Sequence, residues 1–154
     1  SPEEALARSY RFKTGYPELI LVFDVNQSSK DWVAKQQGCW NVISLESVLI
    51  ENKGRMSSTK DFGRALQTAK EKMKEYLALN KKVIWFSESS SADLRSGLIR
   101  IAMNYGAIVT NMCFLEAKVS RQLNSVSIPS IEDAHQFVLC NDKGEEIFRS
   151  PDLI

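Results

Sequence analysis

Short apolar segments alternate with helical patterns along this chain, and that alternation is the feature that most constrains its fold. The first segment, ELILVFD at 18–24, is apolar almost throughout, as is usual for a strand buried on both faces of a sheet. Similar segments predict three further strands, at 40–45, 82–86 and 107–116. Strands that alternate with helices favour an α/β fold, in which helices cover both faces of a parallel sheet.

The longest helical pattern covers 61–80. Apolar residues recur there at helical spacing and predict one buried face. These residues are Phe62, Leu66, Ala69, Met73, Tyr76 and Leu77. Two shorter helices are expected at 31–37 and 117–124.

Helix ends and turns can also be located in the sequence. The serines that precede Asp93 are typical helix caps, and Gly106 is expected to end the helix that they begin. Residues 46–60 are polar, contain a glycine and are interpreted as a loop. Residues 136–150 predict a terminal hairpin that turns at Asn141–Gly144.

The composition fits a single domain without a dominant charge. With 154 residues, of which 44% are hydrophobic, we expect an extension or linker at 1–17 and one domain at 18–154. Twenty basic and nineteen acidic residues leave a net charge of +1, so no overall field favours nucleic acid or a membrane. No apolar run approaches the roughly 20 residues of a membrane span. Three separated cysteines, Cys39, Cys113 and Cys140, are typical of reduced thiols in an intracellular protein, cytoplasmic or nuclear, and no Cys/His cluster predicts a metal site.

Residues 24–31, DVNQSSKD, follow the first strand, where many α/β proteins bind phosphate. The Walker pattern GxxxxGK[ST] surrounds phosphate with backbone amides, while its lysine and hydroxyl contact the terminal phosphates and magnesium. Here Asp24 and Ser29 stand in place of the two glycines. Lys30 retains the lysine, and Asp31 replaces the hydroxyl. Each carboxylate would repel a phosphate charge by roughly 3 kcal/mol at about 5 Å and an effective dielectric of about 20.

Five sequence segments carry a resemblance to a known family. They are KDWVAK, VISLESVL, VIWFSESSSADLR, AMNYGAIV and IPSIEDAH. With them, roughly residues 18–138 resemble the P-loop kinases of the polynucleotide 5'-hydroxyl kinase type. The resemblance implies a three-layer α/β kinase fold with about five mostly parallel strands, and it implies ATP and magnesium as cofactors if the site survives.

The residues that the family uses for catalysis are largely replaced. Its general-base aspartate and its phosphate-binding arginine fall at Glu46 and Leu49. The longer Glu46 side chain displaces the carboxylate from the position that a general base requires, and Leu49 cannot bind phosphate. Phe86 and Ser89 stand where the family has an aspartate and an asparagine, and most of its arginine-rich lid is missing. Glu46 and the loop are therefore interpreted as vestigial.

The cations that remain are candidate contacts to RNA or DNA. They are Arg95, Arg121, Lys70, Lys72 and Lys74. The first two are implied by the resemblance, and the lysines share the outer face of the helix at 61–80. The alternative for the lysines is a solvated helix face, because Glu71 and Glu75 interleave with them.

The loop itself has an alternative interpretation as a helix cap. Ser28 or Ser29 can accept hydrogen bonds from the first free amides of the following helix, and Asp31 suits the positive end of its dipole. Lys30 would then be an ordinary cation near Asp24 or Asp31.

Three functions follow from these observations. The leading hypothesis is an inactive, pseudokinase-like domain of a larger RNA or DNA repair-type protein. Such a domain would act in interaction with another protein or a neighbouring domain, in self-association, or in positioning nucleic acid, with no cofactor or metal. The second is binding of RNA or DNA without ATP. The third is residual 5'-hydroxyl kinase activity that depends on Lys30, Glu46, ATP and magnesium.

Overall fold

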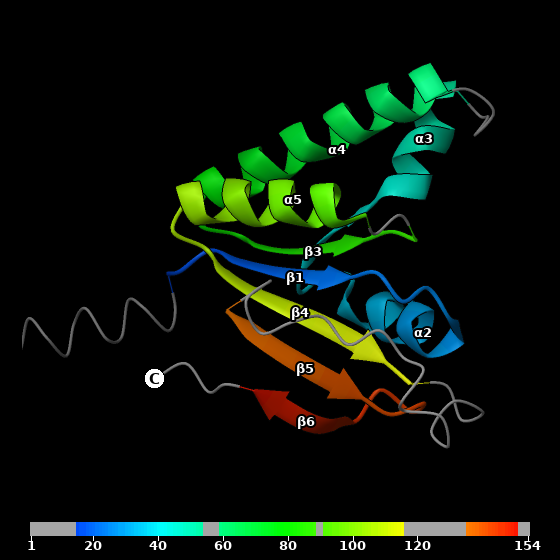
Figure 1. Cartoon of the computed structure of the whole chain (residues 1–154), viewed down its shortest axis with the longest axis vertical. Coiled ribbons are helices and arrows are strands. Elements are labelled where there is room, and N and C mark those ends of the chain that lie inside the picture. Colours follow the sequence, from blue (N-terminus) through cyan, green and yellow to red (C-terminus); the bar gives the residue numbers. More distant parts are fainter. Residues whose placement is uncertain (1–14, 54–58, 89–90, 116–134, 151–154) are drawn as a thin grey trace, which may run out of the picture.

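The computed structural model describes residues 15–53, 59–88, 91–115 and 135–150 (Figure 1). In chain order its elements are β1 (Glu18–Val22), α2 (Gln27–Gln36), β2 (Asn41–Ser44), α3 (Leu45–Lys53), α4 (Thr59–Ala78), β3 (Lys82–Phe86), α5 (Ala92–Asn104), β4 (Ile108–Phe114), β5 (Gln136–Cys140) and β6 (Glu146–Ser150). The alternation of strands and helices predicted from the sequence is confirmed.

The strands form one six-stranded sheet in the order β2-β3-β1-β4-β5-β6. The first five are parallel, and β6 pairs antiparallel with β5 as the second strand of the predicted hairpin. Parallel strands need crossover connections, and the helices supply them. The fold is therefore an α/β sandwich of three layers, with a mostly parallel sheet in the middle.

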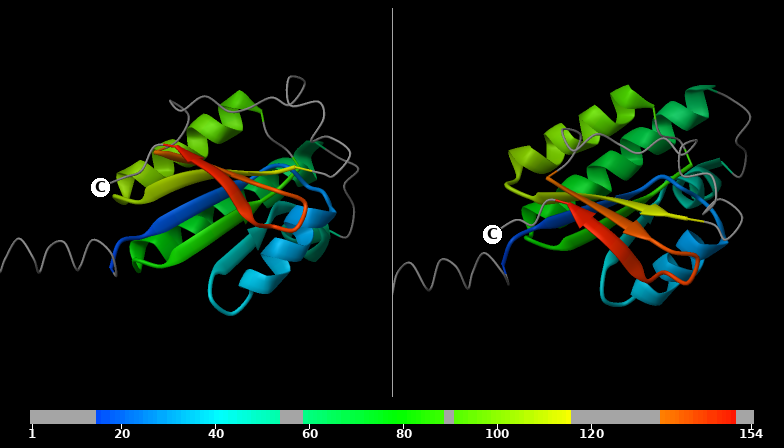
Figure 2. Two further views of the ribbon diagram at one scale, coloured as in Figure 1. Left: turned by 90° about the horizontal axis from the view of Figure 1, so that it is seen from below. Right: turned by 60° about the horizontal axis from the view of Figure 1, so that its bottom comes forward.

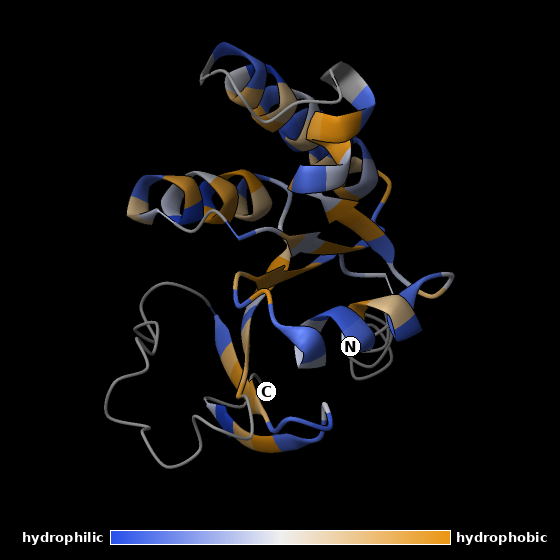
Figure 3. Ribbon diagram, turned by 90° about the vertical axis from the view of Figure 1, so that its right-hand side faces the viewer, coloured by the Kyte–Doolittle hydropathy of each residue, from blue (hydrophilic) through white to orange (hydrophobic). Residues whose placement is uncertain are grey.

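The two faces of the sheet bury alternate residues of each strand. Leu19 and Leu21 of β1 belong to a core cluster shared with α3, α4 and α5, whereas Ile20 and Val22 belong to a cluster shared with Val33 of α2. Because successive side chains of a strand point to opposite faces, three helices cover one face and α2 covers the other. Figure 3 shows the hydrophobic strands between helices whose outer sides are hydrophilic.

Helices α4 and α5 agree with the predictions made for them. In α4, Ala69 and Met73 are fully buried and Leu77 is nearly so, while the other three predicted residues of that face are partly buried and pack against the same cluster. Ser91 caps α5 by accepting a hydrogen bond from the amide of Leu94. After α5, Gly106 adopts a left-handed φ of 70°, which glycine accommodates at low cost.

Two predicted boundaries are wrong. In place of the loop expected at 46–60, helix α3 begins at Leu45, because Leu45, Val48 and Leu49 recur at helical spacing and are buried. Helix α2 begins at residue 27 rather than 31, because the polar residues at its start cap it and form its first turn. The helix predicted at 117–124 lies outside the described residues. Among the described helices, none is long and apolar enough to cross a membrane.

Candidate functional site

The loop at 23–26 lies at the centre of the carboxyl edge of the sheet. It follows β1, which pairs with β3 on one side and β4 on the other, and ligands of open α/β sheets bind at this edge. Only four residues separate β1 from α2. The chain therefore turns directly from strand to helix at the point where a Walker loop would enclose a phosphate.

A capping box occupies the start of α2. The amide of Ser29 donates to Oδ1 of Asn26 over 2.9 Å, and the amide of Asn26 donates to Oγ of Ser29, also over 2.9 Å. The hydroxyl of Ser29 in turn donates to the carbonyl of Asn26 over 3.0 Å, and its side chain is fully buried. The amide of Ser29, which could otherwise bind a phosphate oxygen at this helix N-terminus, is thus already paired within the protein.

The interpretation of the loop as a helix cap is correct, but the predicted capping residue is wrong. Asn26 is the N-cap, and Ser29 is the third residue of the helix and completes the reciprocal pair. Asparagine is among the strongest N-cap residues, so Asn26 followed three residues later by Ser29 was the signal that could have located this motif.

The loop is also attached to the end of β4. Nδ2 of Asn26 donates to the carbonyl of Phe114 over 3.0 Å. The carboxylate of Asp24 accepts hydrogen bonds from the Cys113 thiol and from the amide of Phe114. Burial raises the pKa of Asp24 above its ordinary value, and these two hydrogen bonds oppose the rise only in part. At the position of the first Walker glycine, the chain therefore has a side chain bound to β4.

The β5–β6 hairpin contacts the outer side of the same helix start. The hydroxyl of Ser28 donates to the carbonyl of Asp142 in the hairpin turn over 2.8 Å. Gly144 of that turn has a φ of 79°, and a Cβ atom placed there would lie 3.5 Å from the indole of Trp32. Figure 2 shows the hairpin turn beside α2 in both views. Together with β4, the hairpin holds the first turn of α2 against the sheet.

The remaining residues of the Walker-like segment face solvent. Lys30 and Asp31 are exposed, and Asp31 accepts a hydrogen bond of 2.8 Å from Nε2 of Gln27. Across the described segments, no ion pair joins Lys30 to Asp24 or Asp31, so Lys30 is an exposed cation without a carboxylate bound to it there.

The positions matched to the catalytic base and acceptor arginine have structural roles. Oε1 of Glu46, in the first turn of α3, accepts a hydrogen bond of 3.0 Å from the amide of Glu88, which follows β3. Leu49 is 1% exposed and belongs to the main core cluster. Phe86 packs partly buried against the cluster on the α2 face, whereas Ser89 lies outside the described residues. None of the three described positions offers a phosphate contact.

The predicted cations are divided into paired and unpaired groups. Lys72 forms an ion pair of 3.7 Å with Glu51, and Lys74 forms one of 3.1 Å with Glu71. Lys70 instead reaches α5, where its Nζ lies 3.9 Å from the position that a Cβ of Gly97 would occupy.

Arg95 differs from these lysines because part of its guanidinium is buried. Its Nε has no hydrogen-bond partner, although the side chain as a whole is half-buried. Arg121 lies outside the described residues.

The described residues contain no ready-made cluster of metal ligands. Within them, no group of three His, Cys, Asp or Glu side chains could hold a metal ion. Asp31, the expected magnesium ligand, therefore belongs to no such group. The amide of Ser29 at the same helix start is paired in the capping box.

Comparisons with known proteins support the fold. No protein-family model and no curated protein matches the sequence. A chain of the PezAT chromosomal toxin–antitoxin system of Streptococcus pneumoniae superposes with a TM-score of 0.63 at 13% identity, covering 99% of this chain and 82% of that one. A putative kinase from Chloroflexus aurantiacus superposes with a TM-score of 0.53 at 16% identity, covering 70% and 65% respectively. The chain thus has a P-loop kinase-like fold, and at these identities the likeness extends to the fold alone.

Proposed function

We propose that this chain is a P-loop kinase-like domain that no longer transfers phosphoryl groups and acts as an interaction module within a larger assembly. The capping box between Asn26 and Ser29 is the observation that carries the proposal. A phosphate could use the amides of Asn26 and Ser29 only after that pair of hydrogen bonds had broken. Exchanging these internal hydrogen bonds for hydrogen bonds to a phosphate would add little binding free energy, because the amides are hydrogen-bonded both before and after the exchange.

The other replacements support the same conclusion independently. Leu49 is in the core, Glu46 is hydrogen-bonded to a backbone amide, and Asp24 is attached to β4. Phosphoryl transfer depends on positioned cations and magnesium that stabilise the charge of the transition state. These three positions would each have to change in structure, as well as in chemistry, before they could serve that purpose.

Calorimetric titration with ATP and magnesium at millimolar concentration tests the proposal, with a 5'-hydroxyl kinase assay on a short RNA and DNA alongside. We expect no product, and no saturable heat that depends on Lys30. The alternative function is residual 5'-hydroxyl kinase activity through Lys30. Binding or product that Lys30→Ala abolishes would establish that alternative and refute the proposal, and Lys35→Ala provides the matched control on the same helix.

Self-association is the form of interaction that the outer strand favours. On β6, Ile147 and Phe148 are each 53% exposed, and the strand pairs only with β5 among the described residues. Exposed apolar side chains on an edge strand promote pairing with another strand. Light scattering of the eluted protein should give a mass above 17.4 kDa that Ile147→Lys reduces to that of the monomer. A monomeric mass at every concentration would contradict self-association, and the partner would then be a different protein.

A further inference from the structure

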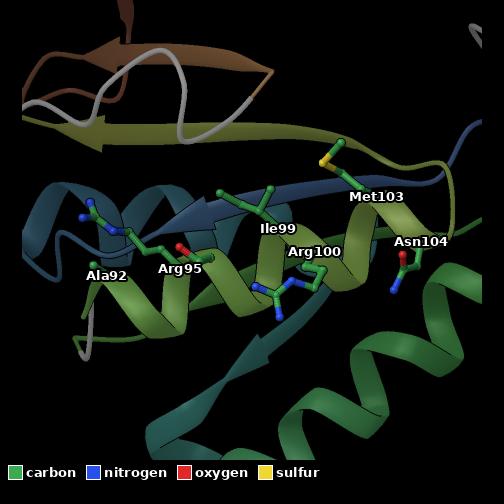
Figure 4. Close-up of a pocket in the computed structure, with 7 residues that line it drawn as sticks. Ala92, Arg95, Ile99, Arg100, Met103 and Asn104 are labelled. Atoms are coloured by element: carbon green, nitrogen blue, oxygen red, sulfur yellow. The ribbon is translucent and has the colours of Figure 1, made fainter.

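A pocket on α5 combines a cavity with two arginines. Its volume is about 440 Å³, and the described residues that line it all come from α5: Ala92, Arg95, Ser96, Ile99, Arg100, Met103 and Asn104 (Figure 4). We call this set the α5 pocket. Ligand pockets of proteins commonly have volumes of about 300–1,000 Å³ and combine apolar walls with a few polar groups. The cavity is large enough for a small metabolite.

The charge of the α5 pocket is not balanced by acidic side chains of the described chain. Within the described residues, Arg95 and Arg100 form no ion pair, and Asp93 is the one carboxylate that α5 carries. Asp93 does not line the cavity. Lys70 of α4 approaches α5 at Gly97, which does not line the cavity either. An anion in the pocket would therefore meet positive charge from Arg95 and Arg100.

Arg95 is the strongest indication of a missing anionic partner. Its Nε is buried from water and makes no hydrogen bond. A buried donor without a partner costs about 1–3 kcal/mol, and more when the group is charged, so such groups usually have a ligand or another protein atom beside them. The nearby Cys113 thiol does not supply a negative charge, because burial, foremost, and the neighbouring Asp24 raise its pKa.

The other residues that line the pocket suit the organic part of an anionic ligand. Figure 4 shows Ile99 and Met103 projecting from α5 on the side of β4, while Arg100 projects on the side of α4. Ile99 is partly buried and Met103 is 57% exposed, so an apolar surface lies between the two arginines. Ser96 and Asn104 add groups that can donate or accept hydrogen bonds.

We propose that the α5 pocket binds a small phosphate monoester, with the phosphate at Arg95 and the organic part against Ile99 and Met103. Guanidinium groups suit this ligand because they bind phosphate oxygens through two parallel hydrogen bonds. None of the residues that line the pocket belongs to the loop at the start of α2, and the proposal does not depend on whether phosphoryl transfer has been lost. A nucleotide and a sugar phosphate share the required chemistry.

Calorimetry with the full chain tests the proposal with five probes: adenosine 5'-monophosphate, glucose 6-phosphate, inorganic phosphate, adenosine and a single-stranded oligonucleotide. We expect saturable binding of at least one monoester, weaker binding of inorganic phosphate and none of adenosine. Whichever of the two monoesters binds with the higher affinity shows whether the ligand is a nucleotide or a sugar phosphate. Binding of neither monoester, or binding of a single-stranded oligonucleotide alone, overturns the proposal.

Matched substitutions locate the binding. Arg95→Gln should weaken the monoester by roughly 10-fold to 100-fold, the usual effect of losing a hydrogen bond to a charged group. Arg64→Gln removes the same charge from an exposed position of α4 outside the pocket and should leave the affinity unchanged. Equal weakening by both variants would show attraction by overall charge and would contradict a site at Arg95.

A second variant adds a carboxylate instead of removing a cation. Ser96→Glu should also abolish monoester binding, because Ser96 lines the pocket and a carboxylate there lies one helical turn from Arg100. The substitution should not destabilise α5, since Ser96 is exposed and glutamate is a better helix former than serine. Retained affinity in a variant that melts at or above the wild-type temperature would refute the proposal.

Discussion

Two regions of this molecule carry groups that suit phosphate, and they differ in whether those groups are already used. At the start of α2, the amides of Asn26 and Ser29, both serine hydroxyls and Asp24 have partners within the protein. On α5, Arg95 has a buried donor without a partner, and Arg100 has no ion pair within the described residues. The comparison shows that resemblance to a phosphate loop and the capacity to bind phosphate can separate. The segment that resembles a phosphate loop uses its main polar groups internally, while a helix with no such motif has unpaired positive charge among the described residues.

Restoring the arginine of the resembled family should have the largest effect. Leu49→Arg places a guanidinium in the core beside α4 without a carboxylate to pair with it. We expect the free energy of unfolding to fall by at least about 3 kcal/mol, because a buried unpaired charge is strongly unfavourable. Urea denaturation measures the change. Leu49→Met is the control and should cost less than about 1.5 kcal/mol. A Leu49→Arg variant as stable as the wild type would show that this position can open toward a ligand.

Removing the cap of α2 should have the next largest effect. Asn26→Ala loses the acceptor for the Ser29 amide and the donor to Phe114, so we expect a loss of about 1–2 kcal/mol and a melting temperature lower by about 2–8 °C. Asn26→Asp keeps the acceptor and loses only the donor, and its stability should therefore lie between those of the wild type and the alanine variant. If ATP bound to the alanine variant but not to the wild type, the capping box alone would be what prevents ATP from binding at the start of α2.

The pH dependence of stability should reveal the buried Asp24. Its pKa is raised in the folded protein, so between the unfolded value of about 3.9 and that raised value the folded state binds more protons than the unfolded state. The stability that this group contributes is greatest at low pH and falls as pH rises through the folded pKa. Thermal unfolding from pH 4 to pH 7 should therefore show Asp24→Asn gaining stability relative to the wild type. A constant difference across this range would mean that Asp24 keeps an ordinary pKa.

The paired lysines should give the smallest effects. Lys72→Gln and Lys74→Gln each remove an exposed ion pair, and such pairs contribute about 0–1 kcal/mol. We expect changes of less than about 0.5 kcal/mol in urea denaturation and no change in monoester affinity. A loss of affinity from either variant, comparable to that from Arg95→Gln, would extend the binding surface along α4 and weaken the contrast between the two regions.

The fold was more predictable than the site because the spacing of apolar residues along the chain reflects which face of each helix or strand is buried. The face of α4 around Met73 was predicted by helical spacing, and β3 was predicted at the bounds observed. Helix α3 was missed because only nine residues form it and its buried leucines resemble the end of a strand.

The site was less predictable because its partners are distant in the sequence. Asp24 could be recognised as unsuitable for phosphate, but its contacts with Cys113 and Phe114 depend on the pairing of β1 with β4. Likewise, the sequence offers no means of distinguishing Lys70 from Lys72. Their difference arises from the packing of α4 beside α5 and from the position of Glu51 on α3.

The contact between Ser28 and Asp142 has a consequence for the order of events during synthesis. The two residues are 114 positions apart, so a nascent chain at about 5–20 residues per second presents the helix start for several seconds before the hairpin exists. During that interval Trp32 lacks the turn at Gly144 that packs against it. This side of the helix therefore acquires its packing partner only when the last strands of the sheet have been synthesised.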